Sequence, residues 1–357
     1  MKMFRHISLI LVVAALAGCA KTEFVPTPEK EVTFAVGSYA PDTKTSSLLD
    51  VDGRIESFRS QGFLHAEGIS TVQNFFGTNG ETISYNGTSL WQPSHTYYWP
   101  KSSNSYINFV SWYDKNGDPD SISDTHATWT IDGTTRTLRA DDNIMFADVA
   151  WHYNQNTTPA TYGHDNVSEG VPTLFHHAMS QVRVQARLQS VSSTSTFTVS
   201  VRNFRLTNVF NTGSLDLNNT EPAGTTPATQ AWSGSWSTEN YTATNMSGLN
   251  NVALSTTATD VFSLQTMIPQ STETINAEFE YAIRTTFSNG DYIEETVPAS
   301  VNLFSFTGDS GQWNMNSRIT YTIVINPETY YITLVPVLTE DWGEAEYITV
   351  PVEPDEE

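Results

Sequence analysis

The sequence has little cysteine and little positive charge. Cys19 is the only cysteine in 357 residues, so no disulfide can form within the chain. The chain carries 17 lysines and arginines against 39 aspartates and glutamates, which gives a net charge of −22. So few cations cannot neutralise phosphates in number, and this argues against nucleic acid as a partner. The same deficit argues against charge-driven docking on anionic lipid.

Long apolar runs and helical periodicity are also scarce. The apolar run Leu9–Ala17 is too short to span a bilayer, and no long segment combines a helical apolar period with capping residues. Only 16% of the residues are charged, while Gly, Ser, Thr and Asn are plentiful. This composition is typical of a secreted β protein with polar turns and not of a helical cytosolic protein.

The N-terminus has the pattern of a bacterial export signal. A basic start precedes the apolar run, and Leu16-Ala17-Gly18-Cys19 looks like a lipobox, whose cysteine becomes diacylated. We therefore expect a lipoprotein signal peptide over residues 1–18 and acyl chains on Cys19 that hold the protein to the outer membrane. The alternative is a plain signal peptide with an incidental cysteine. Residues 19–30 contain prolines and charges and are expected to form a tether.

Turn signals recur at short intervals between segments of alternating apolar residues. The turn pairs are Asn79-Gly80, Asn86-Gly87, Asn116-Gly117, Asp132-Gly133 and Asn289-Gly290. The clearest hairpin joins Tyr281–Phe287 to Tyr292–Val297. Glu221–Asn251, rich in Thr, Ser, Asn and Gly, is predicted to be a long surface loop. Spaced short strands of this kind predict an all-β protein made of sandwiches.

The stretch Thr173–Leu188 combines two apolar patterns. From Gln181 onward apolar and polar residues alternate, as in a half-buried strand. Upstream the phase slips, because Phe175 and Met179 occupy odd positions, and a bulge near Ser180 would reconcile the halves. A helix stays open as the alternative, since several of the same apolar residues also fit a helical period.

The same stretch carries a family resemblance. Its pattern F-x-H-A-x-(S/A)-(K/Q)-V is similar to the middle signature of the Bacteroidetes fimbrillin (Mfa-like) family, and other segments resemble that family in the same order. These segments are Leu16–Cys19, Tyr97–Pro100, Ile107–Tyr113, Asp141–Ala147, Phe175–Val182, Gly213–Leu217, Met267–Gln270, Gly311–Asn326 and Ile332–Trp342. The resemblance implies two tandem transthyretin-like β-sandwich domains, here residues 31–170 and 171–357.

The resemblance also implies a function. Fimbrillins are non-enzymatic structural or adhesive subunits of a surface pilus (fimbria), as stalk, anchor or tip, and their partners are other fimbrillin subunits. In this family a protease is thought to cut after a basic residue and to remove the N-terminal strand. A strand from a neighbouring subunit then fills the groove by β-augmentation. The protein would accordingly reside at the cell surface, anchored in the outer membrane.

Residues can be assigned to these roles in the present chain. The departing strand would contain Val32, Phe34 and Val36, which alternate with polar or small residues. The cut would follow Arg54 or, as an alternative, Lys44. The C-terminal residues with donor-like alternation are Ile348, Val350 and Val352. Two simpler readings stay open: the first strand stays in its sheet, and the last segment is an edge strand of its own domain.

The loop Asp114–Asp120 attracts two further interpretations. It offers oxygen ligands around a glycine, as calcium loops do, but it lacks the downstream glutamate of an EF-hand. A hairpin loop without metal is the alternative. Asp120-Ser121-Ile122 matches the Bacteroidetes O-glycosylation pattern, which makes Ser121 a candidate glycan acceptor.

Catalytic, cofactor and metal sites find little support. Gly308–Gly311 resembles the nucleophile loop of serine proteases, but nothing nominates the other members of a triad. The histidines with potential for zinc are spaced irregularly: they are His152, His164, His176 and His177. We expect His177 to be a core histidine that donates to backbone. We therefore predict no enzyme, no cofactor and no metal.

Aromatic residues suggest a different class of function. Trp151-His152-Tyr153, Trp232 and Trp236 could stack on sugar rings if they lie on loops, which would make the protein a surface glycan-binding lipoprotein. The competing interpretation is that these side chains fill sandwich cores.

Overall fold

The protein consists of strands and turns. The computed structural model describes residues 30–38, 49–50, 53–85, 91–154, 170–190, 197–224, 226–304, 311–329 and 332–341. Over these residues the chain forms β-strands and turns and contains no α-helix. The prediction of an all-β protein is confirmed. The same part of the chain has no helix with the length and apolarity that a membrane crossing requires.

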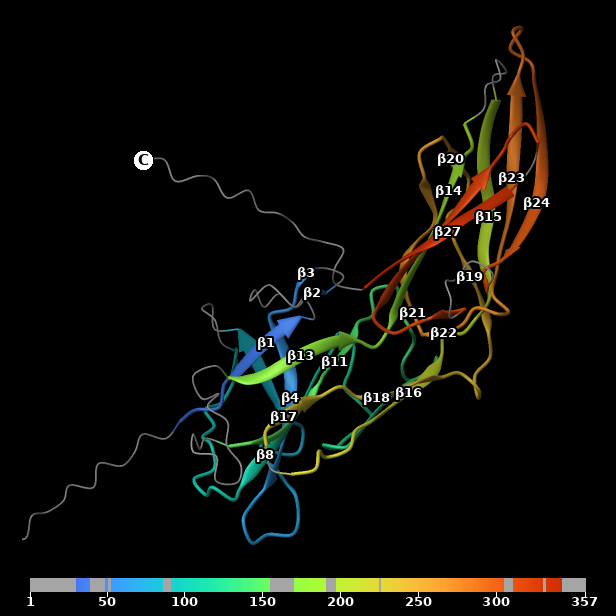
Figure 1. The fold of residues 1–357 in the computed structure, drawn as a ribbon. Coiled ribbons are helices and arrows are strands. Elements are labelled where there is room, and N and C mark those ends of the chain that lie inside the picture. Colours follow the sequence, from blue (N-terminus) through green and yellow to red (C-terminus); the bar gives the residue numbers. More distant parts are fainter. Residues whose placement is uncertain are drawn as a thin grey trace, which may run out of the picture.

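The N-terminal half is built on a ten-stranded sheet. Its strands are β1 (Phe34–Ser38), β4 (Ser57–His65), β5 (Gln73–Asn74), β6 (Glu81–Tyr85), β7 (Trp91–Pro93), β8 (Tyr106–Asp114), β11 (Ile144–Ala147), β12 (Val149–Tyr153), β13 (Val171–His177) and β17 (Ala228–Gln230). Their order is β17-β12-β8-β11-β13-β1-β7-β6-β4-β5, and β4 also pairs with β8. The strands from β8 through β1 to β4 therefore close into a ring, in which β1 lies beside β13 (Figure 1).

The inside of this ring is an aromatic core. Its large members lie on strands of the ring and on the segments that join them, and include Phe34, Phe58, Phe76, Trp91, Trp99, Phe109, Tyr153 and Phe175. Full burial of each such side chain contributes about 1.5–3 kcal/mol. The predicted turn Asn79-Gly80 packs closely against β4. Gly80 adopts a φ of 69°, and a Cβ there would lie 2.6 Å from the Ser60 carbonyl oxygen, so only glycine fits.

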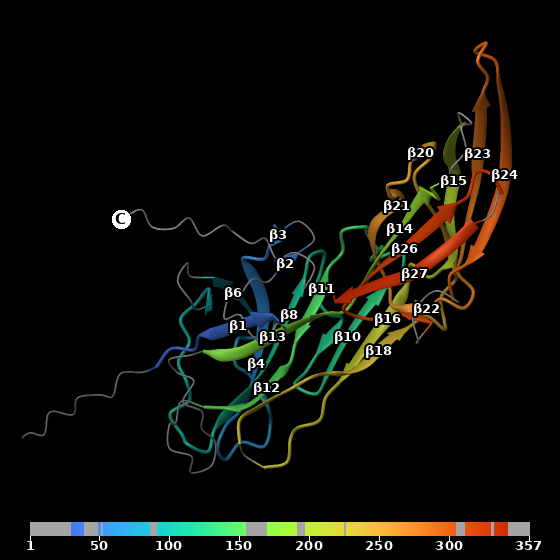
Figure 2. The same cartoon turned by 45° about the horizontal axis from the view of Figure 1, so that its top comes forward.

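A second sheet covers the outer face of the first. It contains β9 (Ser121–Ile122), β10 (His126–Ile131), β16 (Gly213–Asn218) and β18 (Ser233–Ser237), in the order β18-β16-β10-β9. Alternate residues of β10 point inward, with Trp129 1% exposed. Trp129, Leu215 and Trp236 join Trp112 and Phe146 of the ten-stranded sheet in one core. Figure 2 shows β10, β16 and β18 running along the flank of the N-terminal half.

The C-terminal half is a pair of facing sheets. One contains β14 (Ser180–Leu188), β21 (Thr259–Met267), β26 (Ser317–Ile325) and β27 (Ile332–Asp341), in the order β21-β14-β26-β27. The other contains β15 (Phe197–Val209), β19 (Thr244–Ser247), β23 (Asn276–Thr286) and β24 (Tyr292–Asn302), with β20 (Val252–Leu254) also paired to β15. Two short pairs complete the fold: β2 (Leu49–Asp50) with β3 (Gly53–Arg54), and β22 (Gln270–Ser271) with β25 (Gln312–Trp313).

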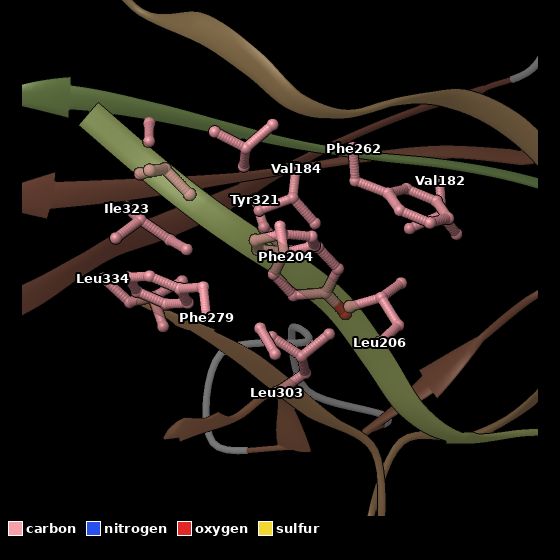
Figure 3. Close-up of a cluster of buried hydrophobic side chains, with 14 of the residues drawn as sticks. Val182, Val184, Phe204, Leu206, Phe262, Phe279, Leu303, Tyr321, Ile323 and Leu334 are labelled. Atoms are coloured by element: carbon pink, nitrogen blue, oxygen red, sulfur yellow. The ribbon is translucent and has the colours of Figure 1, made fainter. Parts of the chain in front are cut away.

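The facing sheets share one apolar core. Val182 and Val184 of β14 and Tyr321 of β26 meet Phe204 and Phe279 of the other sheet (Figure 3). The rings of Phe204 and Phe279 stack with centroids 5.8 Å apart. This is the sandwich packing that the alternation of apolar residues predicts.

The predicted hairpin around Asn289-Gly290 is confirmed and is longer than expected. β23 and β24 pair from Asn276↔Asn302 up to Thr286↔Tyr292. Gly290 has a φ of 88°, which the turn requires. The hairpin projects from the end of the molecule opposite the ring (Figures 1 and 2).

The stretch Thr173–Leu188 is extended and not helical, but the predicted bulge near Ser180 is wrong. β13 belongs to the N-terminal ring and β14 to the C-terminal sandwich. Ala178 and Met179, both 0% exposed, carry the chain from one sheet to the other. The phase slip in the sequence therefore marks a change of sheet, which reverses the side that faces a core.

Two further expectations concern chain organisation. The predicted surface loop Glu221–Asn251 is wrong in part, because it contains β17, β18 and β19. The division at residue 170 stays a prediction. Several strands beyond it pair with the N-terminal sheets: β13 with β1 and β11, β16 with β10, and β17 with β12.

Candidate functional site

The candidate site is the position of β1 in the ring, between β13 and β7 and over the aromatic core; we call it the seat of β1. β1 runs parallel to β13, with Phe34 opposite Val171 and Ser38 opposite Phe175. On its other side Phe34 pairs with Trp91 of β7 in antiparallel orientation. The strand predicted to depart is thus an internal strand with a neighbour on each side.

The apolar side chains of this segment point into the ring core. Val32, Phe34 and Val36 are 2%, 0% and 6% exposed. Val32 lies just before β1, so the segment predicted from alternation begins slightly ahead of the regular strand. The ring of Phe34 meets Phe109 at 5.4 Å and Phe58 at 5.9 Å between centroids, both edge-on. These are the favourable geometries for aromatic pairs.

A short backbone clasp holds the entry to β1. The Val32 amide donates to the Tyr97 carbonyl at 2.9 Å, and the Trp99 amide donates to the Lys30 carbonyl at 3.1 Å. Glu31 forms an isolated bridge with Tyr98 between these two bonds. Residues 97–99 therefore act as a partial strand against the residues that precede β1.

A carboxylate stands behind this clasp. Glu81 accepts hydrogen bonds from the Ser94 hydroxyl, the Tyr97 hydroxyl at 2.8 Å, His95 Nδ1 at 3.0 Å and the Thr82 amide at 3.1 Å. Burial alone would raise the pKa of Glu81, but these hydrogen bonds outweigh burial and lower the pKa below its ordinary value. Burial and the bond to Glu81 raise the pKa of Tyr97 to about 12.

Close backbone approach marks the other end of the seat. Gly170, which leads into β13, has a φ of 79°, and a Cβ there would lie 2.7 Å from the Phe34 carbonyl carbon. The Val171 amide next to it donates to the Thr33 carbonyl at 2.7 Å. Only glycine lets the two chains come this close.

Some buried polar atoms around β1 lack a hydrogen-bond partner among the described residues. Thr33 Oγ1, Trp91 Nε1 and Trp99 Nε1 are buried and have no hydrogen-bond partner among the described residues. A buried polar group without a partner costs about 1–3 kcal/mol. The resident strand therefore leaves unsatisfied groups at its own position.

The candidate cleavage residue Arg54 lies at the end of β3. It pairs with Leu49 across the short β2–β3 hairpin. The next residue, Ile55, is 4% exposed and belongs to the ring core. Arg54 thus marks the point where the N-terminal segment ends and the buried body of the ring begins. Lys44 lies outside the described residues.

The remaining lipid and donor assignments fall outside the described part of the chain. Cys19, Ile348, Val350 and Val352 all lie there, as do Gly308, Asp309 and Ser310 of the serine-protease-like loop. β27, the last described strand before the candidate donor segment, is at the end of the order of its sheet.

Ser121 is exposed, as a glycan acceptor must be. It lies on β9, opposite Thr128 of β10, and its Oγ is 2.7 Å from Thr128 Oγ1. O-glycosylation of Ser121 stays a prediction.

The acidic loop Asp114–Asp120 uses its oxygens internally. Both carboxylate oxygens of the buried Asp114 contact the Arg136 guanidinium, at 2.6 and 2.7 Å. Asn116 Oδ1 accepts from another guanidinium at 2.8 Å, and Asp118 Oδ1 accepts from an indole N–H at 3.1 Å. The arrangement favours a loop held by its own hydrogen bonds over a calcium site.

The histidines make separate contacts. His152 Nε2 lies 2.7 Å from Glu221 Oε1, and His176 Nε2 lies 2.8 Å from Asp148 Oδ1. His177 is a core residue as expected, and its Nδ1 lies 2.8 Å from the Asn143 side-chain oxygen. Within the described residues no three His, Cys, Asp or Glu side chains are grouped as a metal site would require. His164 lies outside these residues.

The aromatic residues proposed to bind sugars are not on an open surface. Trp151, His152 and Tyr153 are at most 3% exposed, and Trp236 is 8% exposed. The indole of Trp236 donates to the Ala178 carbonyl. Trp232 is half-buried against the cores under β18. The core interpretation of these side chains is correct.

Sequence reasoning missed Glu81 and Gly170. A signal for Glu81 was present, because Glu81, Ile83 and Tyr85 lie on one side of an alternating segment in which a carboxylate takes an inward position. Gly170 had no such signal, since its neighbour Phe34 is far away in sequence.

Comparison with known proteins addresses the family. The profile of the "Fimbrillin-like" family matches residues 63–342. The crystal structure of a fimbrial protein from Bacteroides vulgatus is similar, with a TM-score of 0.53, 16% identity, and coverage of 87% of this chain and 99% of that chain. The fimbrial anchor protein Mfa2 from Porphyromonas gingivalis gives a TM-score of 0.35 at 10% identity, covering 88% of this chain and 98% of its own. No curated protein matches the sequence.

The family match spans most of the ring and both sheets of the C-terminal half. It confirms the resemblance that the ordered sequence motifs indicate. This chain belongs to the fimbrillin-like family.

Proposed function

We propose that this protein is a structural or adhesive subunit of a surface pilus and that a strand of a neighbouring subunit replaces β1 during assembly. Membership of the fimbrillin-like family supports the role in a pilus. The observation that carries the exchange is the position of β1, which is buried inside a closed ring and yet belongs to the N-terminal end of the chain.

Removal of β1 would create an acceptor for a strand. The backbone edges of β13 and β7 would lose their partner, and the core under Phe34 would open toward Phe58, Phe76 and Phe109. An exposed strand edge beside an apolar groove is the arrangement that β-augmentation uses. An incoming strand would need apolar residues at alternate positions, as Val32, Phe34 and Val36 provide now.

The unsatisfied polar atoms around β1 favour replacement. A foreign strand that offers acceptors to the indoles of Trp91 and Trp99 would gain hydrogen bonds that β1 does not make. The complex with the foreign strand would then be more stable than the complex with β1. These added hydrogen bonds, and not only the cleavage of β1, would favour the exchange.

The cut is proposed to follow Arg54, with Lys44 as the alternative. A cut there separates β1 from the body, and Ile55 would become a new N-terminus that stays anchored in the core. The donor is proposed to be the C-terminal segment with Ile348, Val350 and Val352. Acyl chains on Cys19 would hold the precursor in the outer membrane before the cut.

The test uses the full-length lipoprotein on cells. N-terminal sequencing of surface-recovered protein should find Ile55 as the first residue, and SDS-resistant ladders should form after treatment with a trypsin-like protease. A variant with Arg54→Ala and Lys44→Ala should keep its N-terminus and form no ladder, while labelling with a palmitate analogue should depend on Cys19. Ladders in the double variant would contradict the proposal.

The same test separates the possible positions in the fibre. A stalk subunit yields ladders of many sizes. An anchor or tip subunit appears once per fibre, and a retained first strand or a retained lipid distinguishes the two ends. Immunogold labelling along the fibre provides the independent readout.

A further inference from the structure

Glu81 connects the body of the ring to the strand that is proposed to leave. It lies on β6, which stays in the body after the exchange, and its side chain is 9% exposed. Besides the neighbouring Thr82 amide, its hydrogen-bond donors are Ser94, His95 and Tyr97, which all belong to the chain that follows β7. One carboxylate thus fixes a whole connecting segment.

Tyr97 links Glu81 to the residues that precede β1. Its hydroxyl donates to Glu81 at 2.8 Å, while its carbonyl oxygen accepts from the Val32 amide at 2.9 Å. Its ring lies edge-on to Phe76 at 4.7 Å, and Phe76 in turn contacts Phe34 at 6.3 Å. The same residue therefore touches the carboxylate, the backbone before β1 and the core beneath it.

We propose that Glu81 is the positioning residue of the clasp formed by residues 97–99, and that its hydrogen bonds determine how fast β1 leaves its seat and how firmly a replacement strand is held. The proposal rests on the proposed exchange of β1. It adds a residue that controls the rate at which β1 leaves.

Three physical points support this role. Hydrogen bonds to an ionised carboxylate are stronger than bonds between neutral groups, so this cluster is a strong hold on an otherwise irregular segment. Among the described residues the clasp joins residues 30–32 through two backbone bonds, so the position of residues 97–99 decides whether these bonds form. A replacement strand would meet the same carbonyl of Tyr97 and the same amide of Trp99, because both stay with the body.

A purely structural role for Glu81 predicts a different outcome. If Glu81 only stabilised the connection between β6 and β7, its loss would lower the stability of the whole ring evenly. The clasp predicts instead a local effect, in which the Val32 and Trp99 amides exchange faster while amides in β8 and β11 keep their protection.

The test compares variants of the full chain after cleavage by an arginine-specific protease. The readout is the rate at which the fragment ending at Arg54 dissociates, followed by native mass spectrometry. Glu81→Gln should speed dissociation by about tenfold or more, since it removes the negative charge and replaces one of the two acceptor oxygens with a donor. Tyr97→Phe, which keeps the ring and loses only the hydroxyl, should give a smaller increase.

Glu67→Gln is the matched control. Glu67 also accepts hydrogen bonds from a serine and a second side chain, here Ser102 and Asn104. Neither of these partners bonds to residues 30–38 in the part of the chain that the structure describes. Its dissociation rate should equal that of the unaltered protein within about twofold.

Hydrogen exchange on the uncut chain separates failure of the clasp from failure of the exchange. Faster exchange at Val32 in Glu81→Gln and Tyr97→Phe supports the clasp even if no fragment ever leaves the cut protein, a result that would contradict the exchange alone. Unchanged exchange at Val32 overturns the role proposed for Glu81, and so does a fragment that leaves the Glu81→Gln protein at the rate measured for the Glu67→Gln control.

Discussion

His177 Nδ1 lies 2.8 Å from Asn143 Oδ1 at the point where the chain passes from the ring to the C-terminal sandwich. His177 is 5% exposed and Asn143 is 0% exposed. Around them, Asn316 Oδ1 accepts from the His177 amide and the Asn316 amide donates to the Met179 carbonyl. A buried polar junction of this kind fixes how the two halves meet, provided that the imidazole stays neutral.

Acid should therefore weaken the junction. Burial, followed by the nearby charges of Arg318 and His176, lowers the pKa of His177 to about 3. Because the unfolded chain has the ordinary pKa of about 6.5, it binds the proton first, and the stability present above pH 6.5 is lost as the pH falls toward 3. The loss is at most about 1.4 kcal/mol per pH unit. Urea unfolding between pH 7 and 4 measures it.

A His177→Phe variant should flatten this part of the pH profile, since it removes the titrating group. Equal slopes in the unaltered protein and in His177→Phe would show that other groups cause the acid sensitivity.

The ring core should depend on Phe34. Phe34→Ala removes a fully buried ring that contacts Phe58, Phe76 and Phe109, so the variant should lose about 3–5 kcal/mol of unfolding free energy. Phe287, which is 46% exposed, is the matched control, and Phe287→Ala should cost less than about 0.5 kcal/mol. Chemical denaturation of both variants is the measurement.

The approach of Gly170 to β1 predicts a backbone-specific defect. Gly170→Ala introduces both a left-handed alanine and a Cβ 2.7 Å from Phe34, so it should cost about 2–4 kcal/mol and expose β1 to hydrogen exchange. Gly68 has a similar φ of 75° and nothing within 4 Å of the position of a Cβ. Gly68→Ala should therefore cost only about 1 kcal/mol. Equal losses of unfolding free energy in the two variants would show that the left-handed backbone conformation, and not the contact with β1, causes the defect.

The buried ion pair should matter more than calcium. Burial outweighs the Arg136 contact and raises the pKa of Asp114, which shows how costly its charge would be without that partner. Arg136→Met should lower the unfolding free energy by about 3–5 kcal/mol. A chelator or added calcium should leave the melting temperature unchanged, and a calcium-dependent rise would reinstate the metal interpretation of Asp114–Asp120.

Local features of the fold could be predicted from the sequence. The hairpin of β23 and β24 followed from Asn289-Gly290, because that pair encodes its turn without help from the rest of the chain. Strand alternation after Gln181 was equally local. The same alternation made Phe34 a candidate before its burial was known.

Long-range relations could not be predicted in this way. The phase slip at Ala178 and Met179 has the same sequence signature whether the chain bulges or changes sheet, and only the partners of β13 and β14 decide. The strand Ser233–Ser237 lacks apolar alternation, because Trp236 is its one buried residue. It forms because its backbone pairs with the edge of β16. Pairing of Phe34 with Val171 depends on contacts across more than a hundred positions in the chain.

The direct pairing of β4 with β8 has a consequence for any vacant state. These two strands are zipped from Arg59↔Trp112 to His65↔Tyr106, on the side of the ring away from β1. If β1 left, as we propose, the ring would open beside β13 and β7 only, because the pairing of β4 with β8 would still hold the opposite side together. In the proposed exchange, the edges of β13 and β7 would then stay in one ring, and an incoming strand would meet an acceptor that was formed when the subunit folded.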